Sequence, residues 1–383
     1  MQISRRTTRL MKALLPIPIV AGIATLLLLS GCGGAAVQGD EANLASTTTV
    51  RVHASGPVSL RGDGGGLSWY GGVALGQGAD SVYTWSGSVS ARTQFKPLLG
   101  DQVWSRGPNF VVDPGATVEI WPRFQGDAGR VDRIDGWWSP SLQDHRPIWI
   151  YTPPSYDEQP DERFPVVYMH DGQNLFDPSY SFAGVTWQVQ DALDQGAADG
   201  SIREAIVVGI GNTGDRIWEY TPSDGGYGGG GAGPYLDFVV GELKPQIDLL
   251  YRTSPDRLDT AIAGSSLGGL VSACAGVWHP EVFGLVGELS PSTWWDNTMI
   301  IGMVRGTAQS PVKPARVYVD SGDSGPSNDD FVNTQSLAQA YRDVGWISVQ
   351  HLIGHGDTHT ESAWARRLPG ALRFLLGSRA AMP

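Results

Sequence analysis

A serine between small residues is the feature of this sequence best suited to chemistry. Residues 264–268 read GSSLG, which matches the pattern Gly-x-Ser-x-Gly with Ser266 at its centre. The apolar stretch 260–263 runs directly into this motif, and the apolar, helix-like stretch 267–278 follows it. A serine in a sharp strand-to-helix turn exposes its hydroxyl, and flanking glycines let neighbouring backbone approach closely. We therefore predict that Ser266 is a nucleophile; the alternative is a serine that caps a helix.

A nucleophilic serine needs a base, and four histidines follow Ser266. They are His279, His351, His355 and His359. His279 ends the helix that follows the serine, and His351 lies inside a predicted strand. His355 and His359 lie in the loop after the last strand, where the base belongs, and spacing alone does not separate them. On a helix, His351, His355 and His359 would form a metal-binding face, but the intervening glycines argue against a helix, so we predict no metal site.

The acid that orients the base should follow the predicted strand 316–319. The loop 321–330 offers three carboxylates, Asp323, Asp329 and Asp330. The acid orients the imidazole and stabilises its cation, so it need only reach one ring nitrogen. Distance from the strand favours Asp323, and Asp330 could equally cap the next helix.

Acyl transfer also needs two backbone N–H groups directed at the developing oxyanion. One should belong to Leu267, directly after the nucleophile, and the other to the loop 170–173 that follows the strand 165–169. Further on, Arg216 and Glu219 are candidates to pair with each other or to contact substrate. The Trp294-Trp295 pair fits either the core or the wall of a substrate cleft.

The elements around these residues indicate the fold class. From about residue 148, apolar strands alternate with helix-like stretches, which predicts a mostly parallel α/β sheet. The strands are 165–169, 205–210, 260–263, 285–289, 316–319 and 347–353. The helices are 235–250, 267–278, 333–344 and 362–376. Residues 48–125 instead show short alternating runs between glycine-rich turns, which predicts a small all-β sandwich. Residues 126–140 are interpreted as a linker before an α/β domain over residues 141–379.

The N-terminus reads as an export signal. A basic segment ending at Lys12 precedes the apolar run 13–30, and Leu29-Ser30-Gly31-Cys32 resembles a bacterial lipobox. We predict a lipoprotein signal peptide over residues 1–32, lipidation at Cys32, a tether over residues 33–47, and a periplasmic or cell-surface location. The alternative is an uncleaved membrane anchor. With Cys32 lipidated, Cys274 is left without a disulfide partner.

The net charge and two tryptophan-containing motifs indicate which molecules this protein could bind. The net charge of −12 argues against nucleic-acid binding, which favours a basic face. In the sandwich, the sequences around Trp69, Lys96 and Trp104 resemble starch-binding carbohydrate modules. That resemblance implies two aromatic rings that stack on sugar and a lysine that binds hydroxyls. A sandwich that acts only as a spacer or lid is the alternative.

Five motifs resemble the Putative esterase family of α/β-hydrolases. They are 167–177 (VYMHDGQNLFD), 219–222 (EYTP), 264–269 (GSSLGG), 290–295 (SPSTWW) and 359–364 (HTESAW). The family includes enterochelin esterases, feruloyl and acetyl-xylan esterases, S-formylglutathione hydrolases and mycolyltransferases. The resemblance covers roughly residues 140–378 and implies an α/β-hydrolase fold for that region.

The resemblance also implies roles for individual residues. The family base precedes a small helix with a tryptophan, which selects His359 over His355. Matching residues 326–329 to the family's mycolyltransferases places the acid at Asp329, although some relatives use only serine and histidine. The second oxyanion donor is the backbone of Gln173.

We therefore expect a serine carboxylic-ester hydrolase with a Ser-His-Asp triad, an acyl-enzyme intermediate and no metal or organic cofactor. Siderophore, feruloyl, acetyl-sugar and simple acyl esters are all compatible with this expectation. An acyltransferase that uses a carbohydrate acceptor is one alternative. The other is a non-enzymatic, carbohydrate-binding surface lipoprotein.

Overall fold

The computed structural model describes residues 47–377 except residue 125. The signal peptide, almost all of the tether and Cys32 therefore lie outside the described residues. Among the residues described, no helix combines the length and apolarity needed to cross a membrane.

Residues 48–120 form the β-rich region expected from their alternating pattern. The strands in this part of the description are β1 (Thr48–Val52), β2 (Val58–Gly62), β3 (Val73–Ala74), β4 (Gly76–Gln77), β5 (Tyr83–Gly87), β6 (Thr93–Leu99), β7 (Val103–Trp104), β8 (Phe110–Val112) and β9 (Thr117–Ile120). One sheet has the order β4-β5-β1-β9, and the other has the order β3-β2-β6-β7 with β8 also paired to β6. Val50 and Trp85 of the first sheet share a buried cluster with Leu60 and Phe95 of the second, so the apolar core lies between the sheets.

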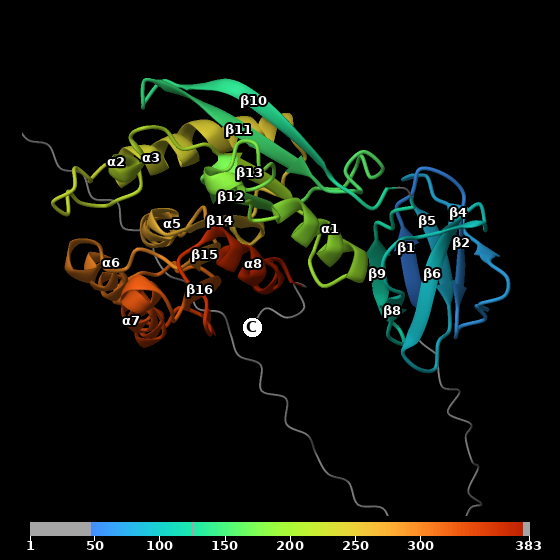
Figure 1. The fold of residues 1–383 in the computed structure, drawn as a ribbon. Coiled ribbons are helices and arrows are strands. Elements are labelled where there is room, and N and C mark those ends of the chain that lie inside the picture. The colour runs from blue at the N-terminus through green and yellow to red at the C-terminus, as the bar shows by residue number, and fades with distance from the viewer. Residues whose placement is uncertain (1–46, 125, 378–383) are drawn as a thin grey trace, which may run out of the picture. The chain divides into compact units, whose positions relative to one another are not determined.

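A second region is built on one eight-stranded sheet with the order β10-β11-β13-β12-β14-β15-β16-β17. Its strands are β10 (Arg130–Ser139), β11 (Asp144–Thr152), β12 (Val166–His170), β13 (Ile206–Ile210), β14 (Thr260–Ser265), β15 (Leu285–Leu289), β16 (Arg316–Gly322) and β17 (Ser348–Gly354). The pairings β10–β11 and β11–β13 are antiparallel, and every other pairing in this sheet is parallel. The predicted α/β class is confirmed (Figure 1).

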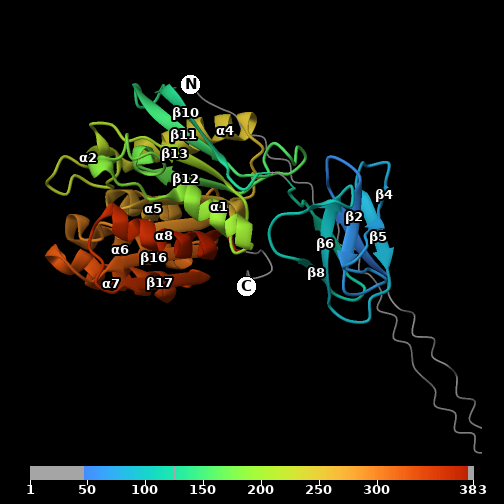
Figure 2. The same ribbon diagram turned by 45° about the vertical axis from the view of Figure 1, so that its right-hand side comes forward.

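Helices cover both faces of this sheet (Figures 1 and 2). They are α1 (Val189–Asp199), α2 (Arg216–Glu219), α3 (Ala232–Phe238), α4 (Lys244–Leu250), α5 (Leu267–Trp278), α6 (Trp295–Gly306), α7 (Phe331–Asp343) and α8 (Glu361–Leu376), and a π-helical turn over Val239–Leu243 joins α3 to α4. Side chains of β12 alternate between the two faces. Val166 and Tyr168 pack in the cluster that holds α3, α5, α6 and α7, whereas Val167 and Met169 pack in the cluster that holds α1 and α8.

The expected linker over residues 126–140 contains a strand instead. Residues 130–139 form β10, the edge strand that pairs with β11. Most of its side chains are exposed or half-buried, and the run RVDRID carries charges, so its alternating pattern is weak in the sequence. Arg133 lies over the rings of Trp149 and Tyr180, at 5.3 and 4.3 Å from their centroids, and its packing anchors the strand.

A buried glutamate makes the stability of this core depend on pH. Glu288 of β15 is fully buried. Burial raises its pKa, the hydrogen bond with Tyr341 lowers it, and burial prevails, so the pKa is about 8. One of its oxygens lies 2.6 Å from the Tyr341 hydroxyl, and the other has no hydrogen-bond partner among the described residues. Glu288 is therefore protonated in the folded protein near neutral pH.

Replacing Glu288 with glutamine should remove that pH dependence. Between the unfolded pKa of about 4.3 and the folded pKa, the folded chain holds a proton that the unfolded chain releases, so rising pH lowers stability. The Tm of Glu288→Gln minus that of the parent should therefore increase as pH rises from about 5 to 8. Scanning calorimetry at several pH values measures this difference, and a difference that stays constant would contradict the assignment.

Candidate active site

The predicted nucleophile lies in a strained turn at the carboxyl end of β14. Ser266 has φ 57° and ψ −122°, a conformation that non-glycine residues rarely adopt. A Cβ added to Gly264 would lie 2.7 Å from the Gly268 backbone, so the turn requires glycine at position 264. The Ser266 N–H donates to the Leu289 carbonyl at 3.0 Å and ties the turn to the neighbouring strand.

Three residues predicted for catalysis meet in one hydrogen-bonded chain. His359 Nε2 lies 2.9 Å from Ser266 Oγ, and His359 Nδ1 lies 2.5 Å from Asp329 Oδ1. His359 comes from the loop between β17 and α8, and Asp329 comes from the 3-10 turn Pro326–Asp330 that follows β16. Loops at the carboxyl ends of three different strands therefore bring together residues 93 and 30 positions apart in the sequence.

The alternative histidine and acids occupy other positions. His355 Nδ1 lies 2.7 Å from Asp323 Oδ2, and the His355 side chain is 83% exposed. Asp330 lies at the N-cap position of α7, but its side chain makes no cap bond there. Its carboxylate accepts instead from the Trp294 N–H at 2.9 Å and from Asn333 Nδ2 at 2.7 Å.

The environment of Asp329 favours its ionised form. Its side chain is fully buried, and burial by itself would raise its pKa. Hydrogen bonds from His359, Ser290 and the Gly322 N–H outweigh burial, so the pKa of Asp329 lies below its usual range. Asp329 is thus a carboxylate that can stabilise a positive charge on His359.

The predicted oxyanion donors lie at the carboxyl ends of adjacent strands. Leu267 is the first residue of α5, after β14, and Gln173 lies in the 3-10 turn Gly172–Asn174, after β12. The preceding loop packs closely on α5, since a Cβ on Gly268 would lie 3.2 Å from His170 Cβ. The arrangement places both backbone segments beside the nucleophile turn.

Buried polar contacts hold the loop that follows β12. Asp171 accepts two hydrogen bonds from Arg216, each of 2.7 Å, and a third from Asn212 at 2.6 Å. His170 Nδ1 lies 2.8 Å from the Tyr235 hydroxyl. Burial lowers the pKa of His170 to about 3, so this histidine is neutral.

Of the two roles predicted for Arg216 and Glu219, pairing with each other is wrong. Arg216 binds Asp171, and Glu219 binds Arg146 of β11 at 2.6 Å. Arg216 and Glu219 each pair with a buried, oppositely charged residue from a distant part of the sequence rather than with each other. The two ion pairs fasten α2 to the loop after β12 and to the antiparallel edge of the sheet.

A cavity of about 430 Å³ opens at the nucleophile. Its lining residues are Ser266, Pro291, Ser292, Trp294, Pro326, Ser327, Asp329, Asp330 and His359. The two adjacent tryptophans differ: Trp294 is 45% exposed and lines this cavity, whereas Trp295 is buried and donates to the Ser223 carbonyl. The exposed ring of Tyr227 lies edge-on to Trp294, with centroids 6.1 Å apart.

Several residues at the site were not found by sequence reasoning. Ser292 Oγ lies 3.4 Å from Ser266 Oγ, and its N–H donates to the Ser266 carbonyl. Ser290 and Arg367 lie behind Asp329. The SPSTWW motif contains both serines, but nothing in its pattern indicates which carboxylate or hydroxyl they reach.

In the β-sandwich, the residues predicted to bind carbohydrate are only partly brought together. The rings of Trp69 and Trp104 lie 6.4 Å apart with an interplanar angle of 28°. Arg61 lies 5.2 Å over the Trp104 ring. Lys96 donates to the Gly107 carbonyl at 2.6 Å, so its ammonium group is already bonded to backbone.

Comparison with known proteins identifies the family. The family model described as "Putative esterase" matches residues 139–375, which is more than half of the chain. The chain belongs to this family and is a carboxylic ester hydrolase.

Individual relatives share parts of the chain. It is 30% identical over 300 residues to an iron(III) enterobactin esterase of Dickeya dadantii, covering 73% of this chain and 64% of the relative. It is 27% identical over 244 residues to an endo-1,4-beta-xylanase/feruloyl esterase of Xylanibacter ruminicola, covering 63% of this chain and 30% of the relative. The chain thus spans less than two thirds of the length of either protein.

The similarity in fold to one solved structure extends beyond the hydrolase region of this chain. The enterobactin esterase FES from Shigella flexneri, solved in the presence of enterobactin, has a TM-score of 0.51 and 18% identity. The match covers 83% of this chain and 87% of that one. Residues 126–383 make up only about two thirds of the chain, so the fold similarity reaches into the residues before 126.

Proposed function

We propose that this esterase acts through a Ser266–His359–Asp329 triad and an acyl-enzyme intermediate. The observation that carries the proposal is the hydrogen-bonded chain from Ser266 Oγ through both ring nitrogens of His359 to a buried carboxylate. Neutral His359 accepts the hydroxyl proton as Ser266 Oγ bonds to the ester carbonyl carbon. Asp329 fixes the tautomer of His359 and stabilises the imidazolium that forms.

The remaining steps follow from the same groups. The N–H groups of Leu267 and Gln173 donate to the oxyanion of the tetrahedral intermediate. His359 gives its proton to the leaving alcohol, and the carbon–oxygen bond of the ester breaks. A water molecule, deprotonated by His359, then attacks the acyl-enzyme and releases the acid, which restores Ser266.

The substrate class proposed is a siderophore or feruloyl ester. The relatives named above support this choice, and the exposed Trp294 ring beside the nucleophile offers a surface for a planar group. The test is a panel of nitrophenyl acyl esters, feruloyl sugars and a ferric catecholate siderophore. Preference for a simple acyl ester over both other groups would contradict the proposed class.

Product analysis and fluorophosphonate labelling separate this proposal from the two alternatives. An acyltransferase would form acylated sugar when a carbohydrate acceptor is added, whereas a hydrolase releases free acid. A non-enzymatic binding protein would not be labelled stoichiometrically by a fluorophosphonate.

The oxyanion assignment predicts a large effect from a small substitution. A Cβ on Gly172 would lie 2.6 Å from the Gly209 backbone, so Gly172→Ala must displace the turn that carries Gln173. We expect kcat to fall about 10²–10³-fold, the cost of losing one oxyanion donor. The measurement is kcat on a nitrophenyl ester, with Tm confirming the fold.

Gly214→Ala is the matched control for this substitution. A Cβ there meets no atom within 4 Å, and Gly214 lies in the loop between β13 and α2. Its kcat should equal that of the parent. A Gly172→Ala protein that is folded and equally active would remove Gln173 from the proposed mechanism.

Export and sugar binding complete the proposal. Cys32 would carry lipid and hold the enzyme on a membrane surface, and a Cys32→Ser protein that still partitions with membranes would refute this. The aromatic pair Trp69–Trp104 would bind a polysaccharide. Affinity electrophoresis in starch gels tests that binding, and unchanged mobility of the full chain would exclude it.

A further inference from the structure

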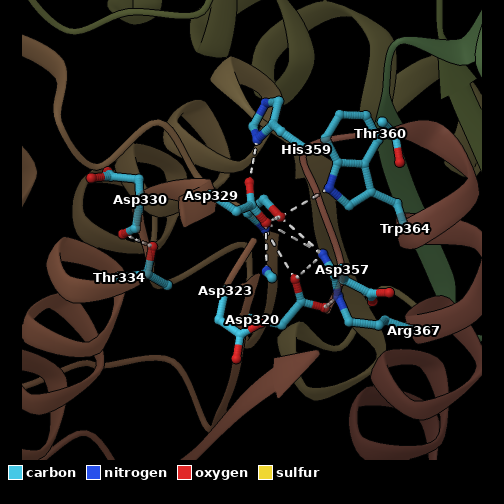
Figure 3. Close-up of polar contacts among 12 residues, drawn as sticks. Asp320, Asp323, Asp329, Asp330, Thr334, Asp357, His359, Thr360, Trp364 and Arg367 are labelled. Carbon is cyan, nitrogen blue, oxygen red and sulfur yellow. Dashed lines mark hydrogen bonds and ion pairs between the residues drawn. The ribbon is translucent and has the colours of Figure 1, made fainter. Parts of the chain in front are cut away.

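The two carboxylate oxygens of Asp329 have separate partners. Oδ1 faces His359 (Figure 3). Oδ2 instead accepts from Ser290 Oγ at 2.6 Å and from the Gly322 N–H at 2.5 Å. Ser290 follows β15, and Gly322 ends β16. The second oxygen is therefore held by two neighbouring strands of the sheet.

The Ser290 hydroxyl can donate only to Asp329. A hydroxyl has one proton and two lone pairs. Trp364 Nε1 donates to Ser290 Oγ at 3.0 Å and Arg367 Nη2 donates to it at 2.9 Å, so both lone pairs are occupied by groups that cannot accept. The remaining proton points to Asp329 Oδ2, and its direction is set by the two donors.

The backbone of Ser290 is held as firmly as its side chain. Its φ is 41°, in the left-handed region. Its N–H donates both to the Asp320 carbonyl at 2.9 Å and to Asp320 Oδ1 at 3.0 Å. Such a conformation persists only where the surroundings enforce it.

Arg367 supplies the charge behind this cluster. Its side chain is 4% exposed and lies between two carboxylates, with ion pairs to Asp320 at 3.0 Å and to Asp357 at 2.7 Å. Its Nη2 lies 4.0 Å from Asp329 Oδ2. The guanidinium thus places a fixed positive charge close to the acid without bonding to it directly.

We propose that Ser290, held by Arg367 and Trp364, is a positioning residue that fixes the orientation and charge of Asp329. The proposal rests on the triad function given above. Trp364 contacts both Ser290 and His359. Its N–H donates a hydrogen bond to Ser290 Oγ, and its ring lies edge-on to the His359 ring with centroids 4.9 Å apart. Ser290 therefore acts on the nucleophile through Asp329 and His359 rather than by touching substrate.

The test has a readout that a purely structural role would not move. Ser290 donates to Asp329, so its removal makes the carboxylate more basic and lets His359 hold its proton more firmly. The acid limb of the kcat/KM profile should then shift to higher pH. The other charged groups around this pair are Asp330 in the loop after β16, Asp320 on β16, Asp357 in the loop after β17 and Arg367 on α8, and all of them stay in place.

The experiment compares Ser290→Ala with the parent on one nitrophenyl ester from about pH 5 to 9. We expect kcat to fall about 100-fold, the usual cost of a small misplacement of catalytic groups, with KM little changed. Trp364→Phe keeps an aromatic ring next to His359 but removes the N–H together with the pyrrole part of the indole, so it should move kcat and the acid limb in the same direction by less. This variant decides the question if Ser290→Ala does not fold.

Ser254→Ala is the control, because the Ser254 hydroxyl also donates to a carboxylate, that of Asp259, at 2.8 Å. This contact precedes the start of β14, whereas Ser266 follows the end of that strand. The kcat and pH profile of Ser254→Ala should match the parent. Folded Ser290→Ala and Trp364→Phe proteins with unchanged kcat and acid limb would overturn the proposal. Undiminished turnover by Ser266→Ala would instead show that the triad function itself fails.

Discussion

Replacing Ser266 with alanine is expected to lower ester turnover by about 10⁶-fold, because a nucleophile and its base act as a unit. In the proposed mechanism, Ser266 Oγ is the atom that bonds to the acyl carbon. Ser292 Oγ is 3.4 Å away from Ser266 Oγ, and no hydrogen bond joins it to His359 among those of the described residues. The measurement is initial-rate hydrolysis of the preferred ester together with fluorophosphonate labelling.

The neighbouring serine supplies the control for this experiment. Ser265 is buried at the end of β14 and takes no part in the chain that joins Ser266 to Asp329. Ser265→Ala should be labelled and should turn over substrate at a rate close to that of the parent. Parent-like turnover by Ser266→Ala would refute the nucleophile assignment and with it the acyl-enzyme route.

Replacing Asp329 with asparagine is expected to lower kcat by about 10⁴-fold through a reversed tautomer. The Ser290 hydroxyl and the Gly322 N–H both donate to Oδ2, so the single carbonyl oxygen of an asparagine would face them. Its amide group would then donate to His359 Nδ1. The proton of the neutral ring would lie on Nε2, which could no longer accept from Ser266.

Asp323→Asn is the matched control for Asp329→Asn. Asp323 binds the exposed His355 and lies in the same loop, so this substitution should leave kcat close to the parent value. Steady-state kinetics of the two variants separate the candidate acids directly. A larger loss for Asp323→Asn than for Asp329→Asn would reverse their assignment.

Local patterns in the sequence account for most of the elements and for the predicted nucleophile. A strand followed by GSSLG and an apolar helix is a local arrangement, so Ser266 could be found without knowledge of the fold. The strands 285–289 and 316–319 were found for the same reason, since buried parallel strands are continuous apolar runs. The strand β10 was missed because an edge strand with one exposed face carries charges that hide its alternation.

Tertiary structure decided the partners, because they depend on distances between segments far apart in the chain. Spacing left His355 and His359 equivalent, and distance from the strand favoured Asp323. The family resemblance selected His359 and Asp329, and the fold brings these two to Ser266 while it pairs His355 with Asp323.

The buried charges show the same division. Arg216 and Glu219 are close in the sequence, and pairing with each other was one prediction for them. A buried charge needs an opposite charge beside it, and in the fold Arg216 pairs with Asp171 and Glu219 pairs with Arg146. The position of Ser290 between Trp364, Arg367 and Asp329 has no local signature at all. The sequence by itself thus determined the class of chemistry and the serine proposed as nucleophile, and only the tertiary structure decided which groups lie against that serine, because contacts across the sheet select them.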